Sequence, residues 1–217
     1  MTSIYAQNRM NGLYQVDVQR NAILDAAETL FLRKGLENTT MGEIAKETGI
    51  HRATLYRYFP DRDPIAFEIA VRMLKKIKSS TDISEQPVYL HAIKEDTLAM
   101  IDQFYQLRDA YRYLGMFDYL YGDSYPNKSL ADWFKEQVNA MRWGKGRFQG
   151  EIPGEVRPKV VMLLNAIMSF LEKMAARGDL MSSEQDVSLD EELLLYERMV
   201  CVYIDDLIAA SQDKYGY

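Results

Sequence analysis

The chain has 217 residues, of which 47% are hydrophobic and 27% are charged, values that suit a globular protein with a sizeable core and exclude wholesale disorder. One cysteine, Cys201, excludes an internal disulfide, and the lack of a signal-like or 18-residue apolar run predicts a cytoplasmic protein without a membrane span. The net charge of −6 is divided unevenly, with +3 over residues 1–80 and −9 over residues 81–217, which allows a mildly basic N-terminal module on an acidic body.

Helical periodicity runs through most of the chain. Apolar residues recur every three or four positions, and all six prolines fall where these patterns stop or start. Alternating apolar and polar runs joined by hairpin dipeptides, which would indicate strands, are missing from the sequence. The sequence therefore predicts an all-α fold with nine helices, at residues 17–34, 41–48, 52–59, 64–79, 87–107, 110–121, 128–142, 156–177 and 190–211.

Polar segments divide these helices into two domains. The first eighteen residues lack a clear pattern, and they are either a disordered arm or an extension of the first helix. The polar stretch that begins near residue 79 predicts the main boundary. We therefore expect an arm at residues 1–18, a smaller domain at 19–80 and a larger helical domain at 81–217.

The sharpest local signal follows the first predicted helix. Thr40 and Glu43 have the spacing of a capping box, in which each residue's side chain accepts a hydrogen bond from the other's backbone amide. Gly49 can adopt the positive φ of a tight turn. Leu55 and Phe59 are four residues apart on the next helix and would face the same core. A short helix, a glycine turn and a second helix with outward polar side chains form the helix-turn-helix pattern.

The second helix of this motif would present its polar side chains to double-stranded DNA. Arg52 and Arg57 would each offer paired donors to guanine in the major groove, worth roughly 1–3 kcal/mol of discrimination. Thr54 would contact a thymine methyl group or a base edge. Phosphates would be bound by the start of the first motif helix and by nearby phenol and guanidinium groups, which set the register without reading sequence. The predicted phosphate contacts are Thr40, Gly42, Tyr56, Tyr58 and Arg62.

A pattern of many parts extends over the first three predicted helices. Its members are residues 23–31, Gly35, Thr39, Thr40, Ile44, Ala45, Gly49, Ile50, Leu55, Tyr56 and Phe59. In order and spacing, over about residues 20–70, this pattern closely resembles the DNA-binding domain of TetR-family transcriptional regulators. Three positions depart from the common pattern, since His51 stands where serine often caps the helix, Tyr58 where histidine is frequent, and Arg62 where lysine is frequent.

The resemblance implies a sequence-specific regulator, expected to be a repressor that a small-molecule effector releases from a palindromic operator. It also implies a homodimer joined by a four-helix bundle. The apolar stripes of residues 156–177 and 190–211 are wider than one core-facing side needs, which favours the same pairing. The expected partners are therefore a double-stranded DNA operator, a second copy of this chain and a small-molecule effector, with no membrane and no cofactor.

The larger domain, expected to serve ligand binding and dimerisation, is rich in aromatic residues. Aromatic side chains with polar tips suit a ligand pocket, but the same spacing is also usual for a helical core. The candidate ligand-binding residues are Thr97, Tyr105, Tyr113, Phe117 and Trp133.

Catalytic and metal-binding interpretations find little support in the sequence. The two histidines, His51 and His91, are forty residues apart and outside any metal-ligand motif. Cys201 lies in an apolar helical stretch, which favours an inert buried thiol. We therefore expect neither an enzyme nor a metal site. The alternative function is a helical ligand-binding or interaction protein with a vestigial DNA module, which would bind no duplex even at low salt.

Overall fold

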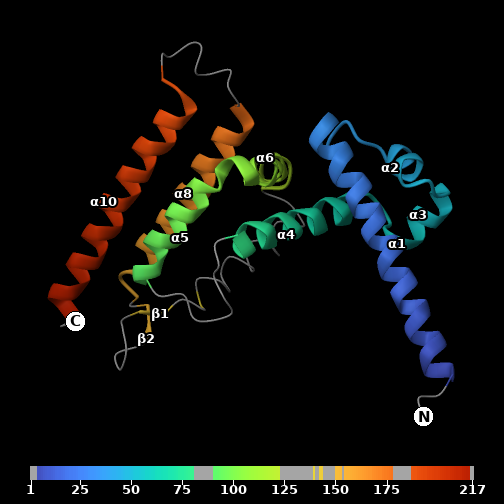
Figure 1. The fold of residues 1–217 in the computed structure, drawn as a ribbon, viewed down its shortest axis with the longest axis horizontal. Coiled ribbons are helices and arrows are strands. Elements are labelled where there is room, and N and C mark those ends of the chain that lie inside the picture. The colour runs from blue at the N-terminus through green and yellow to red at the C-terminus, as the bar shows by residue number, and fades with distance from the viewer. Residues whose placement is uncertain are drawn as a thin grey trace.

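The computed structural model describes residues 4–80, 90–122, 139, 142–143, 150–152, 154–177 and 187–215. Over these residues the fold is all-α, apart from two strands of two residues each. Figure 1 shows a small group of helices at the N-terminal end and a larger group at the C-terminal end, with one helix running between them. None of the helices within the described ranges is both long and apolar enough to cross a membrane.

The N-terminal group consists of α1 (Ile4–Lys34), α2 (Met41–Thr48) and α3 (Arg52–Tyr58), against which α4 (Arg62–Ser80) packs. Their apolar faces meet in a dry core, because positions three and four residues apart share one side of each helix. Fully buried members of this core include Ile23, Phe31, Ile44, Leu55, Phe59 and Ile65. The predicted three-helix domain is therefore built from the residues that the apolar spacing selects.

Two N-terminal boundaries differ from the prediction. Residues 4–18 continue α1 as helix, which corresponds to the alternative of a helical extension. The helix α4 starts at Arg62, two residues before the predicted start at Pro64. Proline is tolerated in the first turn because the amides there have no partner within the helix.

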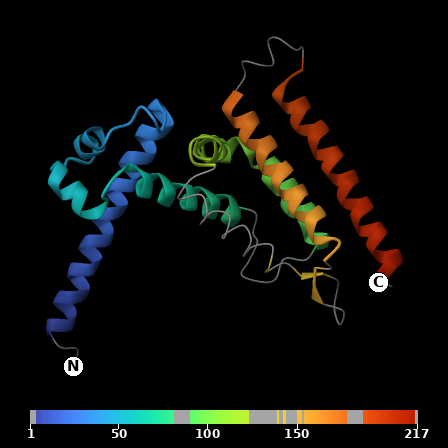
Figure 2. The same ribbon diagram turned by 180° about the vertical axis from the view of Figure 1, so that it is seen from behind.

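The C-terminal group contains α5 (Leu90–Asp102), α6 (Phe104–Tyr121), α8 (Arg157–Arg177) and α10 (Leu189–Tyr215). The helix α6 packs against both α4 and α8, and α10 packs mainly against α5. Figure 2 shows α10 as the outer helix of this group, on the side away from α4. The helix between the two groups, α4, is thus held by both of them.

Polar and aromatic contacts fix α10 on its neighbours. The ammonium of Lys94 on α5 lies 2.8 Å from a carboxylate oxygen of Asp205. The hydroxyl of Tyr105 on α6 donates to Asp190 at 2.6 Å. Phe170 and Tyr196 stack between α8 and α10 with ring centroids 3.6 Å apart. These contacts leave the opposite side of α10 to solvent.

The predicted break between two helices at residues 107–110 is wrong. The chain is helical through these positions, and the break is at Gln103, which has φ −94° and ψ 9°. Buried positions follow one another at helical spacing across the supposed break, at Phe104, Leu107 and Tyr111, so this segment has a single inner face.

Several other expectations concern the segment before α8. The predicted helix at 128–142 lies outside the described residues except at its last positions. There Asn139 is helical, while Arg142 belongs to the strand β1 (Arg142–Trp143). This strand pairs antiparallel with β2 (Gly150–Glu151), a short ladder that the sequence did not predict.

Candidate nucleic-acid interface

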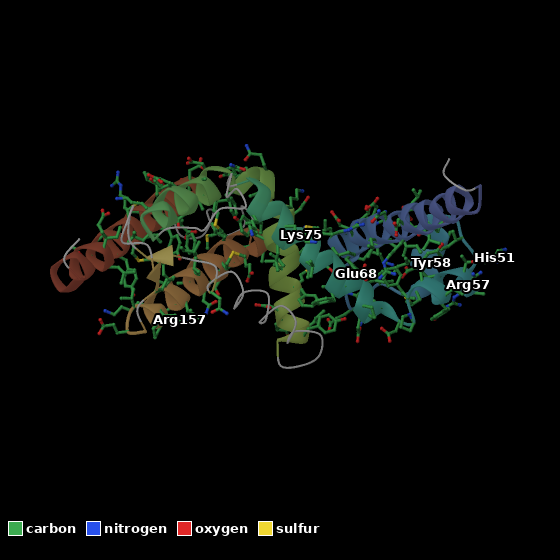
Figure 3. The ribbon with its side chains drawn as sticks, turned by 90° about the horizontal axis from the view of Figure 1, so that it is seen from below. His51, Arg57, Tyr58, Glu68, Lys75 and Arg157 are labelled. Carbon is green, nitrogen blue, oxygen red and sulfur yellow. The ribbon has the colours of Figure 1, made fainter. Side chains whose placement is uncertain are left out.

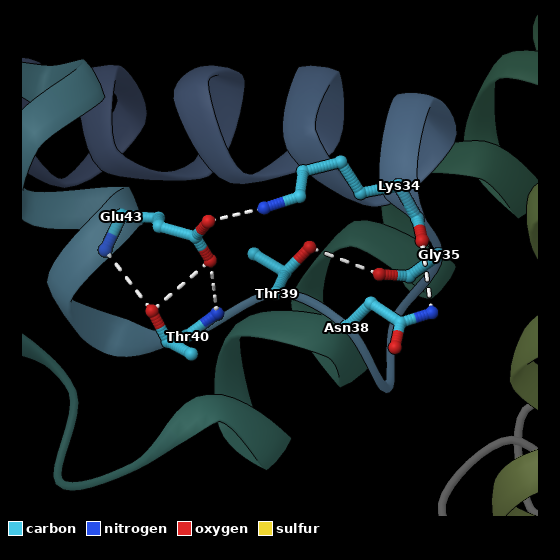
Figure 4. A network of polar contacts seen from close by, with 6 residues as sticks. All are labelled: Lys34, Gly35, Asn38, Thr39, Thr40 and Glu43. Carbon is cyan, nitrogen blue, oxygen red and sulfur yellow. Dashed lines mark hydrogen bonds and ion pairs between the residues drawn. The ribbon is translucent and has the colours of Figure 1, made fainter.

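The start of α2 is fixed by the predicted capping box, drawn in Figure 4. The Thr40 amide donates to the Glu43 carboxylate at 2.9 Å, and the Glu43 amide donates to the Thr40 hydroxyl at 3.3 Å. Lys34, at the end of α1, forms an ion pair with the same carboxylate. The Lys34 ammonium and the Thr40 donors lower the pKa of Glu43 to about 2, so the cap is ionised at neutral pH. One network therefore ties α2 to α1.

Replacing Thr40 by alanine is expected to lower the free energy of unfolding by about 1 kcal/mol, because the Glu43 amide loses its acceptor. Urea denaturation of the DNA-free protein measures this change. Thr29→Ala is the matched control, since Thr29 is exposed within α1 and its hydroxyl bonds only its own helix. Equal effects of the two substitutions would contradict a capping role for Thr40.

A tight turn sets the angle between α2 and α3. Gly49 has φ 73°, and its amide and the Ile50 amide donate back to the last turn of α2. His51 precedes α3 and makes no side-chain cap, as its departure from the common serine suggested. The turn therefore rests on backbone geometry and on the burial of Leu55.

The outer face of α3 carries most of the predicted DNA contacts. The side chains of Arg52 and Arg57 are exposed, and Tyr56 is 47% exposed. Thr54 and Tyr58 are half-buried, and Tyr58 also packs against the core. Figure 3 shows Arg57 and Tyr58 at one end of the molecule, far from Arg157.

Two of the predicted residues from different helices lie side by side. A side chain at Gly42 would place its Cβ 3.2 Å from Nη2 of Arg52, so the guanidinium lies over the start of α2. The free amides at that helix start and the guanidinium therefore point to one small region of surface, together with the exposed Thr40. Free amides, a helix N-terminus and a guanidinium are the groups that proteins use to bind a phosphate.

Arg62 is placed differently from the prediction. Its guanidinium donates to the backbone oxygens of Leu36 at 2.7 Å and Glu37 at 3.1 Å, in the loop between α1 and α2. The side chain is half-buried under this loop. The structure therefore gives Arg62 a role in holding the loop, and phosphate contact by Arg62 finds no support in this geometry.

One residue that the sequence analysis did not single out supports the end of α3. Arg20 on α1 stacks on the Phe59 ring, with its guanidinium carbon 4.3 Å from the ring centroid. It also donates to the backbone oxygen of Tyr58 and forms an ion pair with Glu68 on α4. Arg20 thus connects α4 to the last residue of α3. The sequence could not predict these contacts of Arg20, because its partners Tyr58, Phe59 and Glu68 are 38 to 48 residues away in the chain.

Of the predicted ligand-binding residues that the structure describes, three are buried and one is exposed. Thr97 and Phe117 are buried, and Tyr105 is 52% exposed and bonded to Asp190. Tyr113 is fully buried, and its hydroxyl donates to the backbone oxygen of Ala66 at 2.9 Å. Trp133 lies outside the described residues.

Tyr113 and Tyr121, which lie about two turns apart on α6, join α6 to α4. The Tyr121 hydroxyl donates to the Asp63 carboxylate at 2.7 Å. Burial and this carboxylate raise the pKa of Tyr121 to about 12, and burial raises the pKa of Tyr113 well above its usual value. Both hydroxyls therefore remain protonated donors at physiological pH.

Comparison with known proteins agrees with this geometry. Residues 23–69 match the family model described as bacterial regulatory proteins, tetR family. An HTH-type transcriptional regulator of Staphylococcus aureus (strain bovine RF122 / ET3-1) is 30% identical over 138 residues, which cover 61% of this chain and 62% of that protein. A counterpart in S. aureus strain USA300 is 29% identical over the same lengths. The chain thus matches about three fifths of the length of these curated relatives.

Solved structures show the same fold over a longer stretch. A TetR family transcription regulator from Marinobacter aquaeolei VT8 superposes with a TM-score of 0.57 at 16% identity, covering 88% of this chain and 97% of that one. A TetR transcriptional regulator from Rhodococcus sp. RHA1 gives 0.54 at 17% identity, covering 89% and 97%. Residues 23–69 thus carry a domain that matches the tetR family of bacterial regulatory proteins, and the superpositions show the same fold over most of the chain.

Proposed function

We propose that the protein is a dimeric, sequence-specific DNA-binding regulator of transcription, a repressor that a small-molecule effector releases from a palindromic operator. The observation that carries this proposal is the outer face of α3, where Arg52 and Arg57 are exposed and Arg52 lies beside the free amides at the start of α2. Paired guanidinium donors read guanine, and the helix start binds a phosphate. Thr54 and Tyr56 complete the face.

A homodimer through α8 and α10 is supported by apolar side chains in solvent. Leu195, Met199 and Val202 are 60%, 59% and 61% exposed, and their spacing puts them on one side of α10. On α8, Met162 is 57% exposed. Because a two-fold axis brings the same patch of each copy together, this surface would be buried against itself. The two α3 helices would then enter successive major grooves about 34–36 Å apart.

The proposed effector would act through α4. Tyr113 and Tyr121 bond α6 to α4. Glu68 on α4 forms an ion pair with Arg20 of α1, and Arg20 in turn bonds the last residue of α3. A shift of α6 relative to α4 would therefore alter the position of α3. The coupling is reciprocal, so an effector that weakens DNA binding is itself bound less tightly by the DNA complex.

Substitution of Arg57 by alanine is expected to weaken operator binding at least about tenfold, because each lost guanine contact costs roughly 1–3 kcal/mol and both subunits lose one. Fluorescence anisotropy with a labelled duplex from the DNA beside the gene measures the affinity. Tyr58→Phe tests the phenol alone, since Tyr58 also packs against the core. Arg112→Ala, an exposed arginine on α6, is the matched control.

The salt dependence of the same assay separates this function from the alternative. Phosphate contacts make the affinity fall steeply as salt rises, and a vestigial DNA module binds no duplex even at low salt. Unchanged affinity in Arg57→Ala, with the protein folded, would contradict the role proposed for α3.

A further inference from the structure

A cavity of 210 Å³ lies where α4, α6 and α8 meet. It is smaller than the roughly 300–1,000 Å³ typical of sites for drug-sized ligands, so it suits a small molecule or one end of a larger one. Its lining combines an apolar part with amide, hydroxyl and carboxyl groups. The lining residues are Leu74, Leu114, Asp118, Asn165, Met168, Ser169 and Glu172.

Two carboxyl groups, those of Asp118 and Glu172, line this cavity. Glu172 is half-buried on α8, and burial together with the charge of Asp118 raises its pKa to about 8. Burial also raises the pKa of Asp118, which is the more exposed of the two and lies on α6. No lysine or arginine of the described residues lines the cavity. Such an arrangement is unfavourable when empty and becomes favourable when a cation enters.

A buried hydroxyl near Glu172 also lacks a partner. Tyr111 on α6 is fully buried, and its hydroxyl oxygen makes no hydrogen bond within the described part of the chain. Burial and the charge of Glu172 both raise its pKa, so the hydroxyl lies within electrostatic reach of that carboxyl. Tyr111, Leu114 and Asp118 follow one another at helical spacing along the same side of α6. Buried hydroxyls are nearly always hydrogen-bonded, so this one indicates a missing partner.

We infer that this cavity binds a small organic cation whose ammonium group is held by Glu172 and Asp118, within electrostatic reach of the unpartnered hydroxyl of Tyr111. The side chains of Asn165 and Ser169 add oxygen acceptors, and the apolar part of the lining receives the hydrocarbon body. A metal ion fits less well, because no three His, Cys, Asp or Glu side chains of the described residues gather in a metal-binding group. An ammonium group needs only acceptors and one or two negative charges.

The site is placed to act on DNA binding, and this step rests on the proposed function. Leu74 brings α4 into the lining of the cavity, and Asp118 lies between Tyr113 and Tyr121, which bond α4. A ligand that draws α6 and α8 together would therefore change how α6 holds α4. The binding of the cation itself needs no DNA.

Isothermal titration of the full-length protein with cyclohexylammonium tests the site, and cyclohexanol is the neutral probe of similar shape. We expect cyclohexylammonium to bind at least tenfold more tightly than cyclohexanol. Glu172→Gln and Asp118→Asn are each expected to weaken cyclohexylammonium at least tenfold. Glu95→Gln, an exposed glutamate on α5, should leave it unchanged. Thermal unfolding confirms that each variant is folded.

Three results would overturn the inference. They are equal binding of the two probes, undiminished binding by both carboxyl variants, or saturable Ca²⁺ binding in place of cyclohexylammonium that Glu172→Gln abolishes. The effect on DNA is read separately by adding cyclohexylammonium to the operator complex. Release in the wild type and retention in Glu172→Gln support an effector site. Binding of the cation without release overturns the regulatory step alone, and failure of the protein to bind any duplex overturns the proposed function alone.

Discussion

Replacing Met199 by glutamate is expected to convert the protein from a dimer to a monomer and to weaken operator binding about 100-fold or more. Met199 is 59% exposed in the single chain and stands in the middle of the apolar stripe on α10. In the proposed dimer this stripe is buried, so the new carboxylate would lose its water without gaining a partner. An uncompensated buried charge costs about 3–5 kcal/mol, and each 1.4 kcal/mol is a factor of ten.

Two-fold symmetry enlarges this effect. Each Met199→Glu substitution appears twice in the interface, and the two new carboxylates would also repel each other if they lie near the axis. A monomer can occupy only one half of a palindromic operator, so it loses the affinity that comes from joining two binding modules. Sedimentation velocity measures the oligomeric state, and anisotropy with full and half operators measures the loss.

A matched control separates the interface from general surface effects. Tyr119 on α6 is 87% exposed and lies outside the proposed dimer surface. Tyr119→Glu adds the same charge to an exposed aromatic position and should leave both the dimer and the operator affinity unchanged. If Met199→Glu remained dimeric, the interface would have to lie elsewhere than on the stripe of α10.

The helix-turn-helix motif could be predicted from the sequence because its determinants are close together in the chain. The capping box depends on two residues three positions apart, and the turn depends on Gly49 alone. The helix α2 accordingly begins and ends where the sequence placed it, and α3 differs only at its last residue. The start of α10 carries the same signal, since Ser188 and Glu191 form a capping box with the same spacing.

Contacts between distant segments could not be predicted in this way. Arg62 looked like a basic residue free to meet a phosphate, and only the folded chain shows its guanidinium on the oxygens of Leu36 and Glu37. Periodicity places a side chain on a face of its own helix, but it does not say which helix covers that face. The pairing of Tyr113 with the backbone of Ala66 was hidden for the same reason.

The cavity at α4, α6 and α8 shows the same limit for the ligand site. Asp118 and Glu172 are 54 positions apart in the sequence, and each alone resembles an ordinary surface carboxylate of a helix. The candidates that the sequence suggests are mainly aromatic instead, because aromatic residues are typical of ligand pockets. In the fold Tyr113 and Phe117 are fully buried. The two ionisable residues of the cavity are brought together only by the packing of α6 on α8.

The half-buried carboxyl of Glu172 is expected to make the protein less stable as the pH rises. Its pKa is about 8 in the folded protein against 4.5 for the free side chain. Between these values the folded state holds a proton that the unfolded chain has lost, so stability falls with increasing pH and levels off above about pH 8. At about 1.4 kcal/mol for each pH unit, the difference between the two pKa values limits the loss in free energy of unfolding to about 5 kcal/mol.

Glu172→Gln removes the titrating group and is expected to be more stable than the wild type by about 2–3 kcal/mol at pH 9, with little difference at pH 4. The expected gain is smaller than the limit because the folded protein relaxes and water enters at the exposed edge near Asp118. Urea denaturation across this pH range measures both proteins. Asp118, whose pKa burial also raises, contributes in the same direction and remains in both.

The comparison between the two proteins isolates Glu172, because every other titrating group is shared. Glu95→Gln removes an exposed carboxyl and should follow the wild-type curve at every pH. A difference between Glu172→Gln and the wild type that stays constant from pH 4 to pH 9 would mean that Glu172 ionises normally in the folded protein. The cavity would then hold an ordinary solvated carboxylate, and the electrostatic reason for a cation to enter it would be lost.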